Sequence, residues 1–120
     1  MSRKPVPVLL EHMLEAAREA QAFVCGKQRE DLDGERQLQH SLIRCIQVIG
    51  EAASRVDPVF KVDHPEVPWM DMIGMRNRLV HAYFDVELDI VWRTSVEELP
   101  ELIEVLERLM IEQADGFPPA

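Results

Sequence analysis

The chain has 120 residues, of which 47% are hydrophobic, and its formal net charge is −9. This length suits one domain with a modest core, which a dimer would enlarge. There is no apolar run of about 18 residues, which excludes a membrane span, and no secretory signal at the N-terminus, so we expect a cytoplasmic protein. Because an acidic protein repels polyphosphate, any nucleic-acid site must be a local basic patch.

The first two predicted helices follow apolar stripes of helical period. One covers residues 8–24 and ends at Gly26, after which the polar stretch 27–34 is expected to form a loop. The other covers residues 35–56 and is stopped by Pro58.

A connector and a third helix come next. Residues 57–68 hold three prolines and predict a connector, with at most a short turn around Phe60. The third helix is expected to begin near Pro68, since proline is favoured at the first helical position, and to extend to about residue 84.

The fourth predicted helix begins after Asp85, which is a suitable N-cap, and extends to about residue 113. Pro100 lies inside it and should kink the helix or split it in two. The apolar positions alternate spacings of four and three, as in a coiled coil, and only Ser95 breaks the series. The positions in this seam are Leu88, Trp92, Ser95, Leu99, Leu102, Leu106 and Leu109.

These elements predict an all-α fold, an antiparallel up-and-down bundle of four to five helices. No segment shows the sustained apolar and polar alternation of a β-strand. We expect a single domain over residues 1–120, with its core at about 8–112 and a flexible tail at 114–120. Cys25 and Cys45 fall at apolar helix positions, so both are expected to be reduced packing residues.

An arginine interrupts the apolar stripe of the third helix. At about 100° per residue, six apolar or aromatic residues lie within about 60° of Arg76. Arginine is rarely buried unless it is paired, and helix formation does not require it here, so Arg76 marks a candidate functional site. The alternative is a structural arginine paired with a glutamate of the second or fourth helix, beside an ordinary His81. The six residues of the stripe are Trp69, Met72, Ile73, Leu79, Val80 and Tyr83.

The polar groups around Arg76 suit cleavage of RNA. Asn77 and His81 are four residues apart and share a helix face. When a 2′-hydroxyl attacks the neighbouring phosphorus, histidine can act as base or acid, and arginine can hold the phosphate oxygens. No metal or other cofactor is needed, and His12, His40 and His64 lack the spacing of metal ligands.

The helix geometry limits how these groups can cooperate. Arg76 and His81 lie about 140° apart on a regular helix. They share a substrate only if the arginine bends round, if the helix distorts, or if two subunits close a cleft between two copies. We favour the third route, because a dimer also supplies one histidine as base and another as acid.

The segment MRNRLVHAY at residues 75–83 resembles the Arg-x4-His-x-Tyr motif of HepT-type HEPN toxins. The similarity extends over about residues 8–110 and makes the motif far more specific than an isolated arginine and histidine. Its further blocks are IGEAA at 49–53, HPEVPW at 64–69, IGMRN at 73–77, DIVW at 89–92 and ELPEL at 98–102.

The resemblance implies a helical dimer whose two motifs face each other in a cleft. Active members of the family are metal-independent ribonucleases, and Arg76 and His81 match their essential residues, with Asn77 in a supporting role. Arg78 is a weaker candidate for RNA contact, and tRNA is a plausible substrate by family. The implied partner is an MntA-type nucleotidyltransferase antitoxin, which transfers AMP from ATP to the motif tyrosine, here Tyr83, and so silences the toxin.

Two functions from different classes remain open at this point. One is a dimeric RNase toxin controlled by modification of Tyr83. The other is a catalytically inactive HEPN module that binds and regulates a nucleotidyltransferase, which the net charge of −9 favours slightly. A purely structural helical dimer would leave Arg76 unexplained.

Overall fold

The computed structural model describes residues 4–81 and 87–115, with the backbone alone for Val80, His81 and Asp115. Almost all of these residues are helical and none forms a strand, which confirms the all-α prediction. The elements are α1 (Val6–Val24), α2 (Arg29–Gly34), α3 (Arg36–Arg55), α4 (Pro58–Asp63), α5 (Trp69–His81), α6 (Leu88–Arg93), the π-helical turn η1 (Thr94–Glu98) and α7 (Leu99–Asp115).

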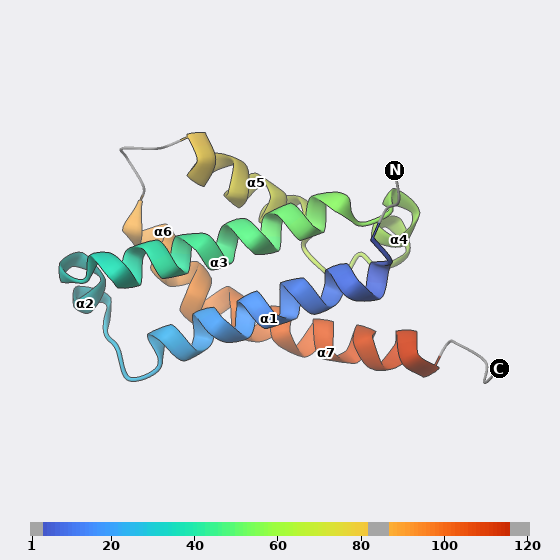
Figure 1. Ribbon diagram of the computed structural model, residues 1–120, viewed down its shortest axis with the longest axis horizontal. Helices are drawn as coiled ribbons and strands as arrows, with labels where there is room; N and C mark the ends of the chain where they lie inside the picture. Colours follow the sequence, from blue (N-terminus) through green and yellow to red (C-terminus); the bar gives the residue numbers. More distant parts are fainter. Residues whose placement is uncertain (1–3, 82–86, 116–120) are drawn as a thin grey trace.

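The long helices form an antiparallel bundle (Figure 1). Helix α1 packs against both α3 and α7, and α5 packs on α3. The apolar stripes predicted from the sequence meet in the middle, where residues such as Leu10, Met13, Leu42, Ile49 and Leu106 are almost completely buried. Full burial of one such side chain contributes about 1.5–3 kcal/mol, so this shared core holds α3 in place as the support for α5. Within the described residues, no helix is both long and apolar enough to cross a membrane.

The stretch at 27–34, predicted to be a loop, in fact contains the short helix α2. The Asp31 carboxylate accepts a hydrogen bond from the backbone N–H of Gln28 at 2.7 Å, which closes the first turn. Leu32 is fully buried and anchors the helix to α3 and α6. One apolar residue in a polar stretch is too weak a periodic signal to predict a helix. Gly26, with a φ of 75°, ends α1 as expected.

The connector at 57–68 holds helix α4 and fixes the start of α5. Asp57 caps α4 by accepting a hydrogen bond from the Val59 N–H at 2.8 Å. The Phe60 ring lies 4.1 Å from the His64 ring and 6.2 Å from the Trp69 ring, measured between centroids. The Trp69 indole Nε1 donates to the His64 carbonyl oxygen at 2.9 Å, so the first residue of α5 is tied to the connector.

The predicted fourth helix is divided, as the proline at its centre indicated. The turn η1 ends at Glu98, two residues before Pro100, and the Leu99 N–H donates to the Thr94 carbonyl oxygen in the wider π pattern. A proline ring clashes with the carbonyl four residues earlier in a regular helix, and the wider turn relieves that clash. The predicted seam is buried from Ser95 onward, and its first two positions, Leu88 and Trp92, are half-buried against the core. The fully buried residue in this first part is Val91, which the predicted seam does not contain. Asp85, the predicted N-cap, lies outside the described residues.

Candidate active site on α5

Helices α3 and α5 touch backbone to backbone at Gly50. A methyl group at this position would collide with the Cβ atom of Arg76 and would lie 2.7 Å from the Met72 carbonyl oxygen. Only glycine lacks a Cβ atom, so only glycine permits this approach. The crossing point of the two helices therefore lies directly beneath the arginine that interrupts the apolar stripe.

The described residues of the apolar stripe on α5 face the core, as predicted, although not all of them are fully buried. Trp69, Met72 and Leu79 are buried, while Ile73 and Arg76 are half-buried. The stem of Arg76 rests on the α3 backbone at Gly50, and its charged end extends outward, as long cationic side chains do at the edge of a core.

The Arg76 guanidinium bends along α5 toward Asn77. Its Nη1 atom donates to the Asn77 Oδ1 atom at 2.6 Å. Within the described residues no carboxylate lies within 4.0 Å of Arg76. The structural alternative, in which this arginine pairs with a glutamate of the second or fourth predicted helix, is not observed there. A half-buried cation whose partner is a neutral amide keeps its charge available for an anion.

The bend of the Arg76 side chain moves its guanidinium toward the side of α5 that carries position 81. Helix α5 is a regular α-helix through His81, so no distortion of the described part of α5 reduces the angle between these two positions. Asn77 lies about 100° and position 81 about 140° from Arg76 on the same side of the helix. By turning toward Asn77, the guanidinium moves onto the flank that carries position 81. The side chain of His81 and all of Tyr83 lie outside the described residues.

Arg78 is exposed, and its Nη2 atom lies 3.8 Å from the Glu87 Oε2 atom. Exposed pairs of this kind contribute at most about 1 kcal/mol, so an approaching phosphate can displace the carboxylate. Asn77 is also exposed, and its amide nitrogen can still donate, because the bond to Arg76 uses only the oxygen.

The cysteines and the other histidines show no arrangement typical of catalysis. Cys45 is buried, and desolvation, with a smaller contribution from nearby Glu19, raises the pKa of its thiol to about 11, which disfavours the thiolate nucleophile. Cys25 is exposed at the end of α1, so its prediction as a packing residue is wrong. Across the described ranges, no three His, Cys, Asp or Glu side chains gather as a metal site would require.

One residue important for this geometry was missed by reasoning from the sequence. Gly50 belongs to the IGEAA block at residues 49–53, and that resemblance by itself predicts no role for it. The available signal was a glycine in the middle of α3, where it costs about 0.5–1 kcal/mol relative to alanine. Such a glycine indicates that another backbone approaches closely.

An all-α bundle with Arg-x4-His on a peripheral helix is HEPN-like in its architecture. The model of the HepT-like ribonuclease family matches residues 13–109, so the chain belongs to this family. A protein of Thermococcus cleftensis named "Probable ribonuclease HepT" is 37% identical over 100 residues, which is 83% of this chain and 91% of the relative. A protein of Caldanaerobacter subterraneus subsp. tengcongensis, provisionally named an RNase, is 34% identical over 84% of this chain and 90% of its own length. No solved structure matches the chain significantly.

Proposed function

We propose that this protein is a metal-independent endoribonuclease that acts as the toxin of a HEPN/MNT toxin–antitoxin pair in the cytoplasm. Membership of the HepT-like ribonuclease family supports the ribonuclease activity. The observation that carries the proposal is the half-buried Arg76, which rests on Gly50 and has a neutral amide as its partner. Such an arginine is suited to hold a phosphate.

In the proposed reaction, Arg76 binds the non-bridging oxygens of the scissile phosphate and stabilises the charge of the phosphorane. A histidine at position 81 takes the proton from the 2′-hydroxyl as its oxygen attacks phosphorus. The bond to the 5′-oxygen breaks, and a second histidine gives that oxygen a proton. Asn77 holds the guanidinium on the correct flank, and Arg78 contacts a neighbouring phosphate of the RNA, for which tRNA is one candidate.

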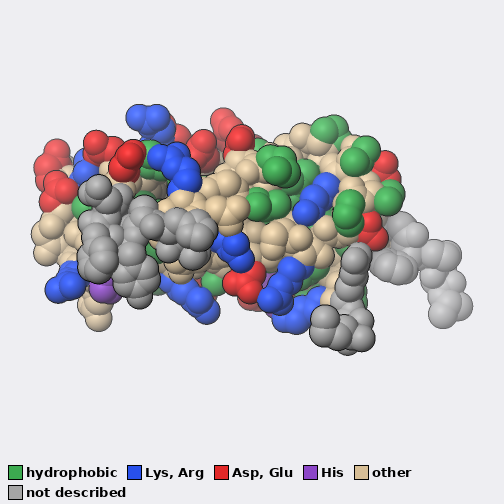
Figure 2. Space-filling view, turned by 90° about the horizontal axis from the view of Figure 1, so that it is seen from above, with side chains coloured by type: hydrophobic (Ala, Val, Ile, Leu, Met, Phe, Trp, Pro, Cys, Tyr) green, Lys and Arg blue, Asp and Glu red, His purple; other side chains and the backbone are tan. Residues whose placement is uncertain are grey.

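The need for a base and an acid together supports a homodimer. A single imidazole cannot act in one step both as the base, which must be unprotonated, and as the acid, which must be protonated. Two copies of the chain supply two histidines, one for each role. Met70 lies on the same flank of α5 as Asn77 and is 74% exposed. Val59 and Val62 on nearby α4 are also strongly exposed, and apolar side chains gather at this end of the molecule (Figure 2). Exposed apolar clusters of this kind are typical of protein interfaces.

The first experiment compares RNA cleavage by wild type and His81→Ala in EDTA, with intact mass showing that the tyrosine is unmodified. We expect the variant to lose about 10²–10⁴-fold in rate, the usual contribution of a general acid or base. His40→Ala is the matched control, because His40 is an exposed histidine on α3, and it should cleave at the wild-type rate. Equal rates for His81→Ala and wild type would exclude His81 as a catalyst.

Silencing is proposed to occur by attack of the Tyr83 hydroxyl on the α-phosphorus of ATP, with release of pyrophosphate. The reaction is catalysed by a partner nucleotidyltransferase of the MntA type. The attached AMP places negative charge and bulk two residues from His81, and both oppose binding of an RNA phosphate. Tyr83→Phe should cleave RNA but accept no AMP from the partner in an intact-mass assay. Modification to the wild-type extent would show that Tyr83 is not the acceptor.

The second candidate is a catalytically inactive HEPN module that binds and regulates the nucleotidyltransferase. The net charge of −9 favours it, because a chain with this charge repels RNA everywhere except near Arg76 and Arg78. Absence of cleavage by unmodified wild type, together with capture of the nucleotidyltransferase, would favour this second function over the first.

A further inference from the structure

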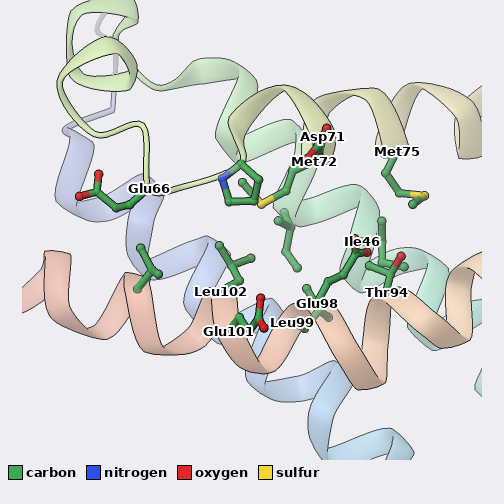
Figure 3. Close-up of a pocket in the computed structure, with 13 residues that line it drawn as sticks. Ile46, Glu66, Asp71, Met72, Met75, Thr94, Glu98, Leu99, Glu101 and Leu102 are labelled. Carbon is green, nitrogen blue, oxygen red and sulfur yellow. The ribbon is translucent and has the colours of Figure 1, made fainter.

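A groove runs along the side of α5 that faces away from Asn77. It lies between α5 on one side and η1 with α7 on the other, and α3 forms its floor (Figure 3). Its volume is about 400 Å³, which is in the range of sites that accept a ligand or a few side chains. The chemistry and the position of the groove are independent of the proposed nuclease.

The floor and walls of the groove are apolar. They are formed by aliphatic and methionine side chains, two of which, Met72 and Met75, come from α5. Methionine is flexible and polarizable, and it adapts to partners of varied shape. The remaining apolar side chains are Ile46, Ile49, Pro68, Leu99, Leu102 and Val105.

Four carboxylates line the groove beside this apolar surface, and among the described residues no lysine or arginine lines it. Glu66, Asp71, Glu98 and Glu101 all belong to the groove. In Figure 3, Glu98 and Glu101 lie on its η1 and α7 side, whereas the Glu66 side chain points away from its centre. Over the described ranges, Asp71, Glu98 and Glu101 have no Lys or Arg within 4.0 Å, and Glu66 has only His64, at 3.7 Å. The negative charge beside the apolar floor is therefore uncompensated, and it favours a cationic occupant.

An unsatisfied hydroxyl lies in the wall of the same groove. The Thr94 Oγ1 atom is buried and has no hydrogen-bond partner among the described residues. Figure 3 shows this oxygen on the side of Thr94 that faces Met75. A buried polar atom without a partner is uncommon, and movement of the flexible Met75 side chain would open it to a polar group of a bound molecule.

The position of the groove separates it from the proposed catalytic flank. On the α5 wheel, Met75 and Asp71 lie about 100° and 140° to one side of Arg76, whereas Asn77 lies about 100° to the other side. A second copy that covers Met70 and Asn77 would leave the groove open. RNA is also excluded as the occupant, because four carboxylates repel a phosphate backbone.

We propose that this groove is the docking site for an amphipathic segment of a partner protein, one that presents lysine or arginine beside apolar side chains. Apolar anchors of the segment lie on the methionines and on the α3 floor, while its cations face Asp71, Glu98 and Glu101. An amphipathic helix laid into an apolar groove is a common recognition mode, and complementary charges at the rim select the partner and its orientation.

The test uses the full chain with ¹³C-methyl-labelled methionine and, as probe, a synthetic amphipathic helical peptide of leucine and lysine. We expect saturable binding that shifts the methyl signals of Met72 and Met75. The signals of Met70, on the opposite flank, and of Met13, in the core, should stay in place. Shifts at Met70 alone, or no saturable binding, would overturn the proposal.

A charge-matched pair of variants separates docking from general attraction to an acidic protein. Neutralising Asp71, Glu98 and Glu101 to the corresponding amides should weaken peptide binding about tenfold, at about twofold for each charge lost. The control neutralises Glu11, Glu15 and Glu112, which are exposed and lie outside the groove, and should bind as wild type does. Equal weakening in the two triple variants would contradict the proposal.

Two further outcomes would also overturn it. A lysine peptide without leucine that binds equally well would show simple attraction between charges, with no contribution from the apolar floor. A change in the oligomeric mass of the groove variant, with unchanged peptide binding, would show that the groove is an interface between copies of this chain.

Discussion

The close contact between α3 and α5 makes Gly50→Ala the most informative perturbation of the proposed site. The added methyl group would collide with the Cβ atom of Arg76 and lie 2.7 Å from the Met72 carbonyl oxygen. Both contacts are with atoms at or next to the α5 backbone, so a side-chain rotation cannot relieve them. Helix α5 must instead move away from α3, and it carries the Arg76 guanidinium with it.

The size of the effect follows from this geometry. Ordinary contacts begin near 3.4 Å, so the Met72 oxygen alone requires a retreat of about 0.7 Å or more. Such overpacking costs about 1–3 kcal/mol, and alanine returns about 0.5–1 kcal/mol by its better helix propensity. The chain should therefore remain folded. A displacement of about 1 Å in a catalytic group lowers the rate by about 10²-fold, so we expect kcat to fall about 10- to 100-fold.

The assay measures single-turnover RNA cleavage beside thermal unfolding, and Gly74→Ala serves as the matched control. Gly74 lies on α5 itself, whereas Gly50 lies on α3, and a Cβ atom at position 74 would meet nothing within 4 Å. That variant should gain about 0.5–1 kcal/mol in stability and cleave at the wild-type rate. The two substitutions thus add the same methyl group, one on α3 against the Arg76 side of α5 and one on the opposite side of α5.

A second readout measures the position of Arg76 independently of catalysis. The side-chain N–H signals of Arg76 in an NMR spectrum, assigned with Arg76→Lys, should shift in Gly50→Ala and remain in place in Gly74→Ala. Unchanged arginine signals and an unchanged cleavage rate in Gly50→Ala would refute the claim that this glycine positions Arg76. Inactive wild type with shifted signals would instead count against the nuclease alone.

Two predictions concern buried groups away from α5. Thr94→Val should raise the free energy of unfolding in urea by about 1 kcal/mol, because it removes a buried hydroxyl that has no partner in the described structure. The control is Ser95→Ala, which deletes a hydrogen bond of 2.9 Å to the Val91 carbonyl oxygen and should not raise the free energy of unfolding. A lower free energy of unfolding in Thr94→Val would contradict the prediction. Burial raises the pKa of Cys45 from 9.0 to about 11, so the unfolded thiol loses its proton first and stability falls as pH rises through this window. Cys45→Ala should show a shallower fall between pH 9 and 11, and identical slopes would refute the assignment.

Hydrophobic period predicted the long helices well because each buries a continuous stripe. The bounds of α1 and α3 differ from the prediction by no more than two residues. The short helices were harder to predict, since α2 depends on one buried leucine and α4 on a cap and the stacking of Phe60 with His64. Such helices are held by tertiary contacts that a window of sequence does not contain.

The candidate site shows the same limit at the level of single residues. The wheel predicted Arg76 within the apolar stripe, and its half-buried stem confirms this. The direction of its guanidinium could not be predicted, because it depends on the Asn77 amide and on the contact with Gly50. The groove was also not predicted, since its carboxylates come from the connector, α5, η1 and α7, which only the fold brings together.

The π-helical turn before Pro100 sets the rotation of α6 relative to α7 about the helix axis. A π turn contains one residue more than an α turn, so the phase of the buried face shifts by about 100° across Thr94–Glu98. Removal of one residue from this turn could restore a regular helix locally, but it would turn α6 against α7 by that angle. Since α6 contacts α2 and α7 contacts α1, the turn lets each half keep its own partner. The extra residue thus adjusts the register between two packing surfaces that a single straight helix could not serve together.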